Sequence, residues 1–200
     1  VYIVMHKLMK NFSKSATKGF SLVLTGFLFM VGTMLSISSF AQENGVTNAE
    51  QKEWSANYPI GTKMIEGKSL DQTGRLITLS ELSGERGYLL IMNRSVVWWG
   101  YCKRQLVQLS NRAEEFTAQG FELVTMTYDS NEDALLFHQQ SNLNFPILRD
   151  ADSVHIKSLG ILNETVAKDH WAYGVPYPGI YLVDASGIIR GKFAEQGYIK

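Results

Sequence analysis

The chain has 200 residues, of which 45% are hydrophobic and 12% aromatic, and its formal net charge at pH 7 is zero. This is enough apolar material for one packed domain with extensions. The charge is uneven, because residues 1–41 hold four lysines and no acidic residue, which leaves 15 basic and 19 acidic residues in the rest. A mildly acidic body excludes the basic surface on which nucleic-acid binding depends, so we expect no nucleic-acid partner.

An export signal is predicted at the N-terminus. The lysine-bearing segment is followed by an uncharged apolar run, residues 19–37, and then by Ser39 and Ala41, small residues that suit a cleavage site after Ala41. The run is also about long enough to cross a bilayer, so an uncleaved membrane anchor is the alternative. Positive charges before such a run stay in the cytoplasm. We therefore expect residues 1–41 to be a signal peptide or anchor that sends the body to the periplasm or cell envelope.

The body begins with a polar stretch and a hairpin. Residues 42–58 are polar and show no periodicity, which predicts a linker and places the folded domain at residues 59–200. Residues 63–82 hold two short extended segments around the turn 71–74, a pattern typical of a hairpin. The continuous apolar run at 88–92 predicts a strand that is covered on both faces.

A long helix is predicted after this strand, over residues 100–119. Its apolar residues recur at intervals of three and four positions, so they share one face of the helix. They are Cys102, Leu106, Leu109, Ala113 and Phe116. Gly120 follows in the position where glycine commonly ends a helix.

The remaining elements alternate between strands and helices. They are a strand at 121–127, a helix capped by residue 129 or 130 and ending near 140, an extended segment at 145–148, a short helix at 153–159, and a hairpin of strands 180–183 and 188–193. Asp129, Glu132 and Asp133 surround a helix start, where carboxylates are ordinary capping groups. Helices that connect successive strands make those strands parallel. We therefore predict an α/β fold, a three-layer sandwich with a central mixed sheet flanked by helices.

Four motifs in this order carry a resemblance to a known family. They are YLLIMNRSVVWWGYCKRQLVQL at 88–109, FELVTMTYDS at 121–130, NFPILRDAD at 144–152 and YGVPYPGIYLVDASGIIRGKF at 173–193. Together they resemble the thioredoxin-fold redoxins, in particular the alkyl hydroperoxide reductase/thiol-specific antioxidant group and its peroxiredoxin-like members. The resemblance covers residues 59–200 and implies a thioredoxin-like sandwich.

The resemblance also implies a pair of cysteines, Cys-x-x-Cys, where the first long helix begins. In the family the leading thiol reduces a peroxide or exchanges with a disulfide, and the trailing thiol resolves the product. The trailing position here is Cys102, the only cysteine of the chain. The leading position is Trp99, and Gly100 stands where the family often has proline. The main nucleophile of the family is therefore replaced in this sequence.

Further residues are expected to surround Cys102. Pro178 matches a proline that is usually cis in thioredoxin-like chains, so we expect a cis bond after Tyr177 that leaves the Tyr177 backbone free to pair with a substrate. Arg94 and Ser95 are expected to donate hydrogen bonds to a peroxide or a thiolate, and residues 163–173 to form a lip over the site. The expected lining is Arg94, Ser95, Trp98, Trp99, Gly100, Tyr101, Tyr177 and Pro178.

Three interpretations of Cys102 stay open, because one cysteine cannot form an internal disulfide. Cys102 lies on the apolar stripe of its helix, where it would pack as an inert hydrophobic residue. It also lies in the first helical turn beside Lys103 and Arg104, where positive charge favours a thiolate and a redox role. The third interpretation is an intermolecular disulfide. Trp99 has two interpretations, a contact surface for a partner or a cover for the helix start.

We expect an exported redoxin of the thiol-dependent peroxidase or thiol–disulfide oxidoreductase type, with an antioxidant role in redox homeostasis and Cys102 as its catalytic candidate. Its substrate would be a peroxide, a thiol or a disulfide, and an external thiol would be the reductant. The alternative is a non-catalytic binding module that takes an extended peptide or a partner protein between Trp99 and Pro178. No residue cluster has metal-ligand spacing and no phosphate loop is present, so we expect no metal and no cofactor.

Overall fold

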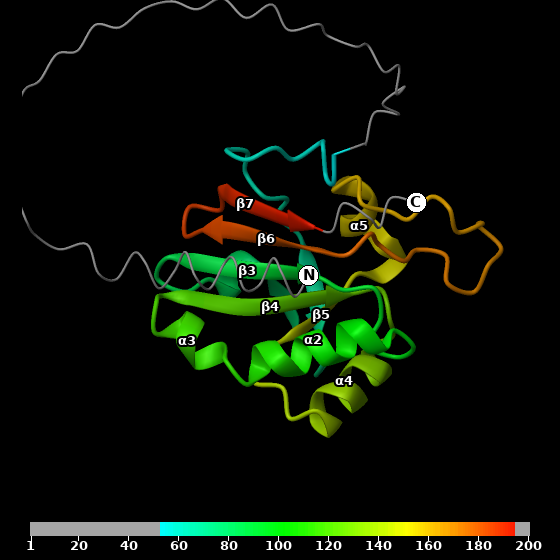
Figure 1. Cartoon of the computed structure of the whole chain (residues 1–200), viewed down its shortest axis with the longest axis horizontal. Coiled ribbons are helices and arrows are strands. Elements are labelled where there is room, and N and C mark those ends of the chain that lie inside the picture. Colours follow the sequence, from blue (N-terminus) through cyan, green and yellow to red (C-terminus); the bar gives the residue numbers. More distant parts are fainter. Residues whose placement is uncertain (1–52, 195–200) are drawn as a thin grey trace, which may run out of the picture.

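A seven-stranded mixed sheet organises residues 53–194, which are the residues described by this computed structural model (Figure 1). Its strands lie in the order β2-β1-β5-β4-β3-β6-β7. The strands are β1 (Lys68–Asp71), β2 (Leu76–Thr78), β3 (Gly87–Met92), β4 (Phe121–Thr127), β5 (Ile147–Arg149), β6 (Gly179–Asp184) and β7 (Ile189–Ala194). The helices are α2 (Gly100–Ser110), α3 (Ala113–Thr117), α4 (Asn131–Gln140) and α5 (Val154–Ser158), with short 3₁₀ turns η1 (Ser80–Leu82) and η2 (Ala151–Ser153).

The predicted export segment is not part of this structure. Residues 1–41, with their apolar run 19–37, lie outside the described residues, and so does most of the expected linker. Between residues 53 and 194 no helix is long and apolar enough to cross a membrane.

The strand pairings confirm the predicted mixed sheet. β3 is parallel to β4 and β4 is parallel to β5, because helices connect these strands. The hairpins β1–β2 and β6–β7 are antiparallel, and β6 also pairs antiparallel with β3. In the first hairpin the Asp71 carboxylate accepts hydrogen bonds from Thr73 N at 2.8 Å and Arg75 N at 3.0 Å. The predicted turn is therefore closed by one of its own side chains.

Alternate residues of the central strand β3 point into two separate cores. Tyr88, Leu90 and Met92 belong to the core covered by α5 and by the segment before β1. Leu89 and Ile91 belong to the core covered by α2, α3 and α4. Every residue of β3 is buried for this reason, which explains its continuous apolar sequence. Figure 1 shows α2, α3 and α4 together on one side of the sheet and α5 on the other, as expected for a three-layer sandwich.

The helix predicted over 100–119 is interrupted in the structure, between α2 and α3. The Ser110 carbonyl oxygen accepts a hydrogen bond from the Asn144 side-chain amide at 3.1 Å, and Ser110 Oγ lies 2.9 Å from Asn144 Oδ1. A partner from the loop before β5 thus replaces a partner in the next helical turn, and the helix breaks there. The apolar stripe continues across the break, because Leu109 and Phe116 enter the same core.

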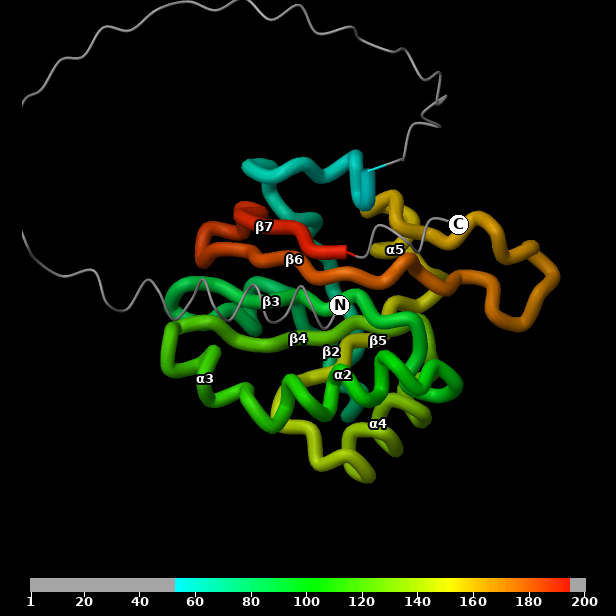
Figure 2. The backbone as a smooth tube through the Cα atoms, in the orientation of Figure 1, coloured from blue at the N-terminus to red at the C-terminus, as the bar shows by residue number. Residues whose placement is uncertain are grey.

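The end of the expected linker packs against the sheet, so the folded domain begins earlier than we expected. Within residues 53–58, Trp54 stacks on Tyr181 with ring centroids 4.6 Å apart and donates from Nε1 to Tyr177 O at 2.9 Å. Gly179 has no side chain, which leaves the space that the indole fills. Figure 2 shows this segment, in cyan, next to β7. A lone tryptophan in a polar stretch gave no periodicity from which to predict this packing.

Replacing Trp54 by alanine tests where the domain begins. We expect Trp54→Ala to lower the free energy of unfolding by about 3 kcal/mol, because a large packed ring and its hydrogen bond are lost. Urea denaturation of the full chain measures this change. Ile60→Ala is the matched control, because Ile60 is 61% exposed and should change stability by about 0.5 kcal/mol at most. Equal free energies of unfolding for the two variants would show that residues 53–58 belong to the linker and not to the folded domain.

Candidate functional site

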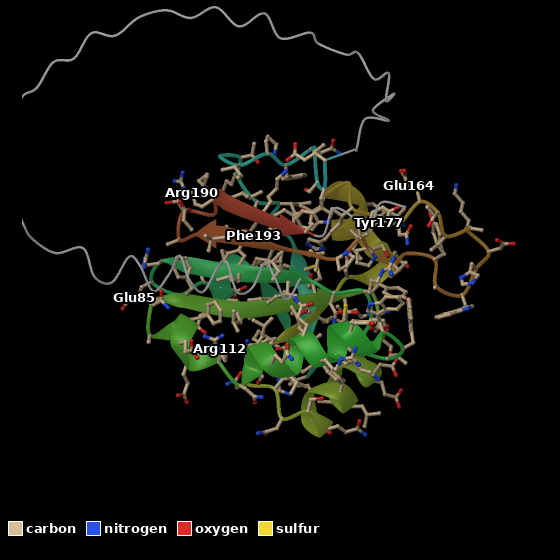
Figure 3. All side chains as sticks on the ribbon, in the orientation of Figure 1. Glu85, Arg112, Glu164, Tyr177, Arg190 and Phe193 are labelled. Carbon is tan, nitrogen blue, oxygen red and sulfur yellow. The ribbon has the colours of Figure 1, made fainter. Side chains whose placement is uncertain are left out.

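The candidate site lies at the end of the sheet where the parallel strands β3, β4 and β5 finish. Three connecting segments leave the sheet there, at 93–99, 128–130 and 150–153. Met92 at the end of β3 pairs with Gly179 at the start of β6, which puts Tyr177 and Pro178 at the same edge. Figure 3 shows Tyr177 at this end of the molecule and Arg190 at the opposite end. The topology therefore brings both groups of expected lining residues to one edge.

A buried carboxylate fixes the loop between β3 and α2. Asp129 Oδ1 accepts a hydrogen bond from Ser95 Oγ at 2.9 Å, and Asp129 Oδ2 accepts from Val96 N at 2.7 Å and Thr127 Oγ1 at 2.6 Å. Only 7% of Asp129 is exposed. Burial raises the pKa of the Asp129 carboxyl, and the three hydrogen bonds oppose this rise because they favour the charged form.

Ser95 extends this arrangement into the backbone of the loop. Its hydroxyl oxygen accepts from Val97 N at 2.9 Å and from Trp98 N at 3.2 Å, while its proton is donated to Asp129. The hydroxyl therefore holds the loop together. We had expected it to donate to a peroxide or a thiolate, and in this structure its proton has another acceptor.

The Cys102 side chain is buried in the first turn of α2, behind the N-cap residue Trp99. Its exposed fraction is 5%. Burial raises the pKa of the Cys102 thiol. Hydrogen bonds with the backbone of Arg94 and Ser95 and the positive charge of Arg94 oppose this rise, whereas the negative charge of Asp129 adds to it. The balance favours the protonated thiol at neutral pH.

The two cations that we expected to favour a thiolate have other partners. Lys103 Nζ donates to Val97 O at 2.9 Å, so this side chain folds back onto the loop. The Arg104 guanidinium lies 4.6 Å from the centroid of the Tyr101 ring, on the outside of the helix. Among these cations, it is Arg94 whose charge acts on the sulfur.

Aromatic side chains form the outer wall of the site. The aromatic cluster consists of Trp98, Trp99, Tyr101, Tyr128 and Trp171. Trp98 Nε1 donates to Tyr128 OH at 3.0 Å, and the Trp98 ring meets Trp99 and Trp171 edge-on with centroids 5.5 and 5.1 Å away. Trp171 belongs to the expected lip at 163–173, which therefore does reach the site. Trp98 is the indole at the centre of the cluster, with a partner on each side.

The predicted cis bond before Pro178 is wrong, since no peptide bond within residues 53–194 is cis. Tyr177 N donates to Ile161 O at 2.7 Å, and Tyr177 O accepts from Trp54 Nε1 at 2.9 Å. Both backbone groups of Tyr177 are paired inside the protein, and they are not free to pair with a substrate as we had expected.

Histidine and acidic residues elsewhere at this edge have structural partners. Asp150 accepts hydrogen bonds from the backbone N–H groups of His155 and Ile156, both at 2.9 Å, and so begins α5. His155 Nδ1 lies 3.0 Å from the same carboxylate. In the described part of the chain no group of three or more His, Cys, Asp or Glu side chains could hold a metal ion.

Sequence reasoning treated Asp129 as a capping group and missed its role. The cap of α4 is Ser130, whose Oγ accepts from Asp133 N at 3.1 Å. A signal was present, because Asp129 lies two residues after the buried strand β4 and the carboxyl ends of parallel strands commonly carry functional residues. Trp171 had no comparable signal, because it comes from a distant loop without periodicity.

Comparison with known proteins agrees with this architecture. The AhpC/TSA family profile matches residues 60–192. Peroxiredoxin-2 of Macaca fascicularis is 24% identical over 146 residues, which are 68% of this chain and 69% of that protein. The thiol-disulfide oxidoreductase ResA of Bacillus subtilis is 30% identical over 83 residues, which are 41% of this chain and 45% of that protein.

Solved structures show the same fold. The peroxidoxin BcpB from Mycobacterium tuberculosis has a TM-score of 0.61 at 17% identity, covering 68% of this chain and 86% of that one. A thiol peroxidase from Chromobacterium violaceum has a TM-score of 0.58 at 17% identity, covering 72% and 80%. These neighbours are thioredoxin-fold peroxiredoxins, so the predicted thioredoxin-like fold is confirmed. With a family profile that spans more than half of its length, this chain belongs to the AhpC/TSA family of redoxins.

Proposed function

We propose that this chain is an exported redoxin of the thiol peroxidase or thiol–disulfide oxidoreductase type that works through Cys102. The position of the sulfur is the observation that carries the proposal. Cys102 lies in the first turn of α2, and the backbone of Arg94 and Ser95 lowers the pKa of its thiol by favouring the charged form. Hydrogen-bond donors and a nearby guanidinium are the groups that stabilise a thiolate. Family membership supports the class of chemistry.

Burial sets the rate of this chemistry. The thiolate is the form that attacks, and burial raises the pKa of Cys102, so the reactive fraction at neutral pH is small. The fraction grows as the pH rises through the thiol pKa. Turnover is therefore slow at neutral pH and faster in alkaline solution.

As a peroxidase the site uses one protein thiol. The Cys102 thiolate attacks a peroxide oxygen, the O–O bond breaks, and an alcohol or water leaves while the sulfur becomes a sulfenic acid. An external thiol condenses with the sulfenic acid, which releases water and leaves a mixed disulfide. A second external thiol attacks that disulfide, restores Cys102, and departs as an oxidised pair. The reductant is external because Trp99 occupies the leading position of the family's cysteine pair.

Export is part of the same proposal. Residues 1–41 combine lysines, the apolar run 19–37 and small residues up to Ala41, which is the pattern of a signal peptide or of an anchor that is retained. The body would then work in the periplasm or cell envelope, an oxidising environment in which disulfides persist and the cycle depends on a supply of external thiol.

A second candidate, a non-catalytic binding module, is favoured by the exposed part of the aromatic cluster. Tyr101 and Trp171 are 70% and 69% exposed, and Val97 is exposed as well. The Arg104 guanidinium lies over the Tyr101 ring. Exposed rings beside arginine are typical of protein-binding surfaces. Such a surface would take an extended peptide or a partner protein next to Trp99, and this needs no thiolate.

Replacing Cys102 by serine separates the two candidates. Serine fills nearly the same space but forms neither a sulfenic acid nor a mixed disulfide. We expect the full chain to consume hydrogen peroxide when excess dithiothreitol is present, and we expect Cys102→Ser to fall to the rate of dithiothreitol alone. A colorimetric peroxide assay measures both rates. Equal consumption by both folded proteins would exclude the thiol function and leave the binding module.

Rebuilding the cysteine pair tests whether the scaffold still supports disulfide exchange. Trp99 is extended at the N-cap (φ −98°, ψ 91°), and Gly100 is the first residue of α2. Proline is favoured at a first helical position after an extended residue. A Cβ at Gly100 would lie 3.5 Å from Arg104 Nη1, an ordinary contact. We therefore expect Trp99→Cys with Gly100→Pro to fold and to gain insulin-reducing activity.

The matched control for this gain is Trp99→Ser with Gly100→Pro, which has the same backbone changes and no second thiol. We expect the control to reduce insulin no faster than the unchanged chain. If the rebuilt pair folds and still matches the control, the surroundings of Cys102 have lost the capacity for exchange.

A further inference from the structure

The Asp129 carboxylate accepts three hydrogen bonds, none of which serves to cap the helix that follows it. Ser130 already caps α4, so the carboxylate of Asp129 is not required for that helix. Its two oxygens instead take donors from the loop after β3, Ser95 Oγ and Val96 N, and from Thr127 Oγ1 at the end of β4. One buried side chain thus connects the ends of two central strands.

The same loop carries the groups that contact the sulfur. The Ser95 side chain donates to Asp129, and the Ser95 backbone lowers the pKa of the Cys102 thiol. Arg94, one residue earlier, contacts Cys102 through its backbone and its charge. The position of these groups over the sulfur therefore depends on the hydrogen bonds that Asp129 accepts.

Asp129 also acts on Cys102 directly through its negative charge, which adds to the effect of burial on the thiol pKa. Charges on neighbouring elements enter the same balance. Arg94 acts on the sulfur with the opposite sign, and Asp133 on α4 acts on Asp129. Tyr128 stays neutral, because burial raises the pKa of its phenol.

We propose that Asp129 is the positioning residue of the Cys102 site. It holds the loop so that the backbone of Arg94 and Ser95 faces the sulfur, and its negative charge disfavours a thiolate there. The functional importance of Asp129 rests on the proposed thiol function of Cys102. Its test measures the state of the sulfur and needs no peroxide turnover.

The test is the pH profile of Cys102 alkylation by iodoacetamide in the full chain, followed by mass spectrometry. Asp129→Asn keeps the shape of the side chain and removes its charge. We expect the midpoint of the profile to move to lower pH, with several-fold faster alkylation at pH 7. An unchanged midpoint, or one at higher pH, would overturn the electrostatic half of the proposal.

Ser95→Ala tests the positioning half independently, and it serves even if Asp129→Asn fails to fold. This variant keeps the Asp129 charge, leaves it with fewer donors, and loosens the turn that aligns the backbone with the sulfur. The loosened turn no longer aligns the backbone N–H groups with the sulfur and so disfavours the thiolate, and we expect the midpoint to move to higher pH. A midpoint that stays or falls would contradict the positioning role.

The opposite directions of the two shifts distinguish this role from general destabilisation, which would move both midpoints the same way. Circular dichroism of both variants checks that the fold is retained. The inference and the proposed function also fail separately. If the chain does not consume peroxide but the two variants shift in opposite directions, the peroxidase function is rejected and the positioning role of Asp129 is kept. If the chain consumes peroxide but the shifts are not seen, the peroxidase function is kept and the positioning role is rejected.

Discussion

The hydrogen bonds between the Asp129 carboxylate and its donors are the interaction on which the candidate site depends. They join the end of β4 to the loop after β3, and that loop leads directly into α2. The sheet alone would bring the two strand ends side by side, but it would not fix the path between them. Burial makes the arrangement strong, because a buried carboxylate must be matched by donors or lose its charge.

The start of α2 combines a tryptophan at the N-cap with a buried cysteine in the first turn. Trp99 adopts an extended N-cap conformation, and α2 starts at the next residue, Gly100. The indole, which packs against Trp98 and lies beneath the Arg94 guanidinium, fills the outer face of the helix start. Cys102 remains one turn further along, facing the interior. The start of α2 therefore presents aromatic surface outside and a buried sulfur inside.

Periodicity and turn chemistry predicted the strands, both hairpins and the mixed sheet, because those features are set by local residue order. The helix break at Ser110 escaped prediction, since its cause is Asn144, which lies 34 residues away. Trp54 was missed for the same reason, as its partners come from β6 and the residue before Pro178. The cysteine position could be read from the sequence, but the burial of its sulfur and the role of Asp129 needed the tertiary arrangement.

The most direct test of this account compares the alkylation of Cys102 in the native full chain with that in the same chain unfolded in urea, across a range of pH. Burial and the Asp129 charge outweigh the donors around the sulfur. The native profile should therefore lie at higher pH than the unfolded one, with slower labelling at neutral pH. A native thiol that reacts at the same pH as the unfolded one, or at a lower pH, would contradict a buried and protonated sulfur.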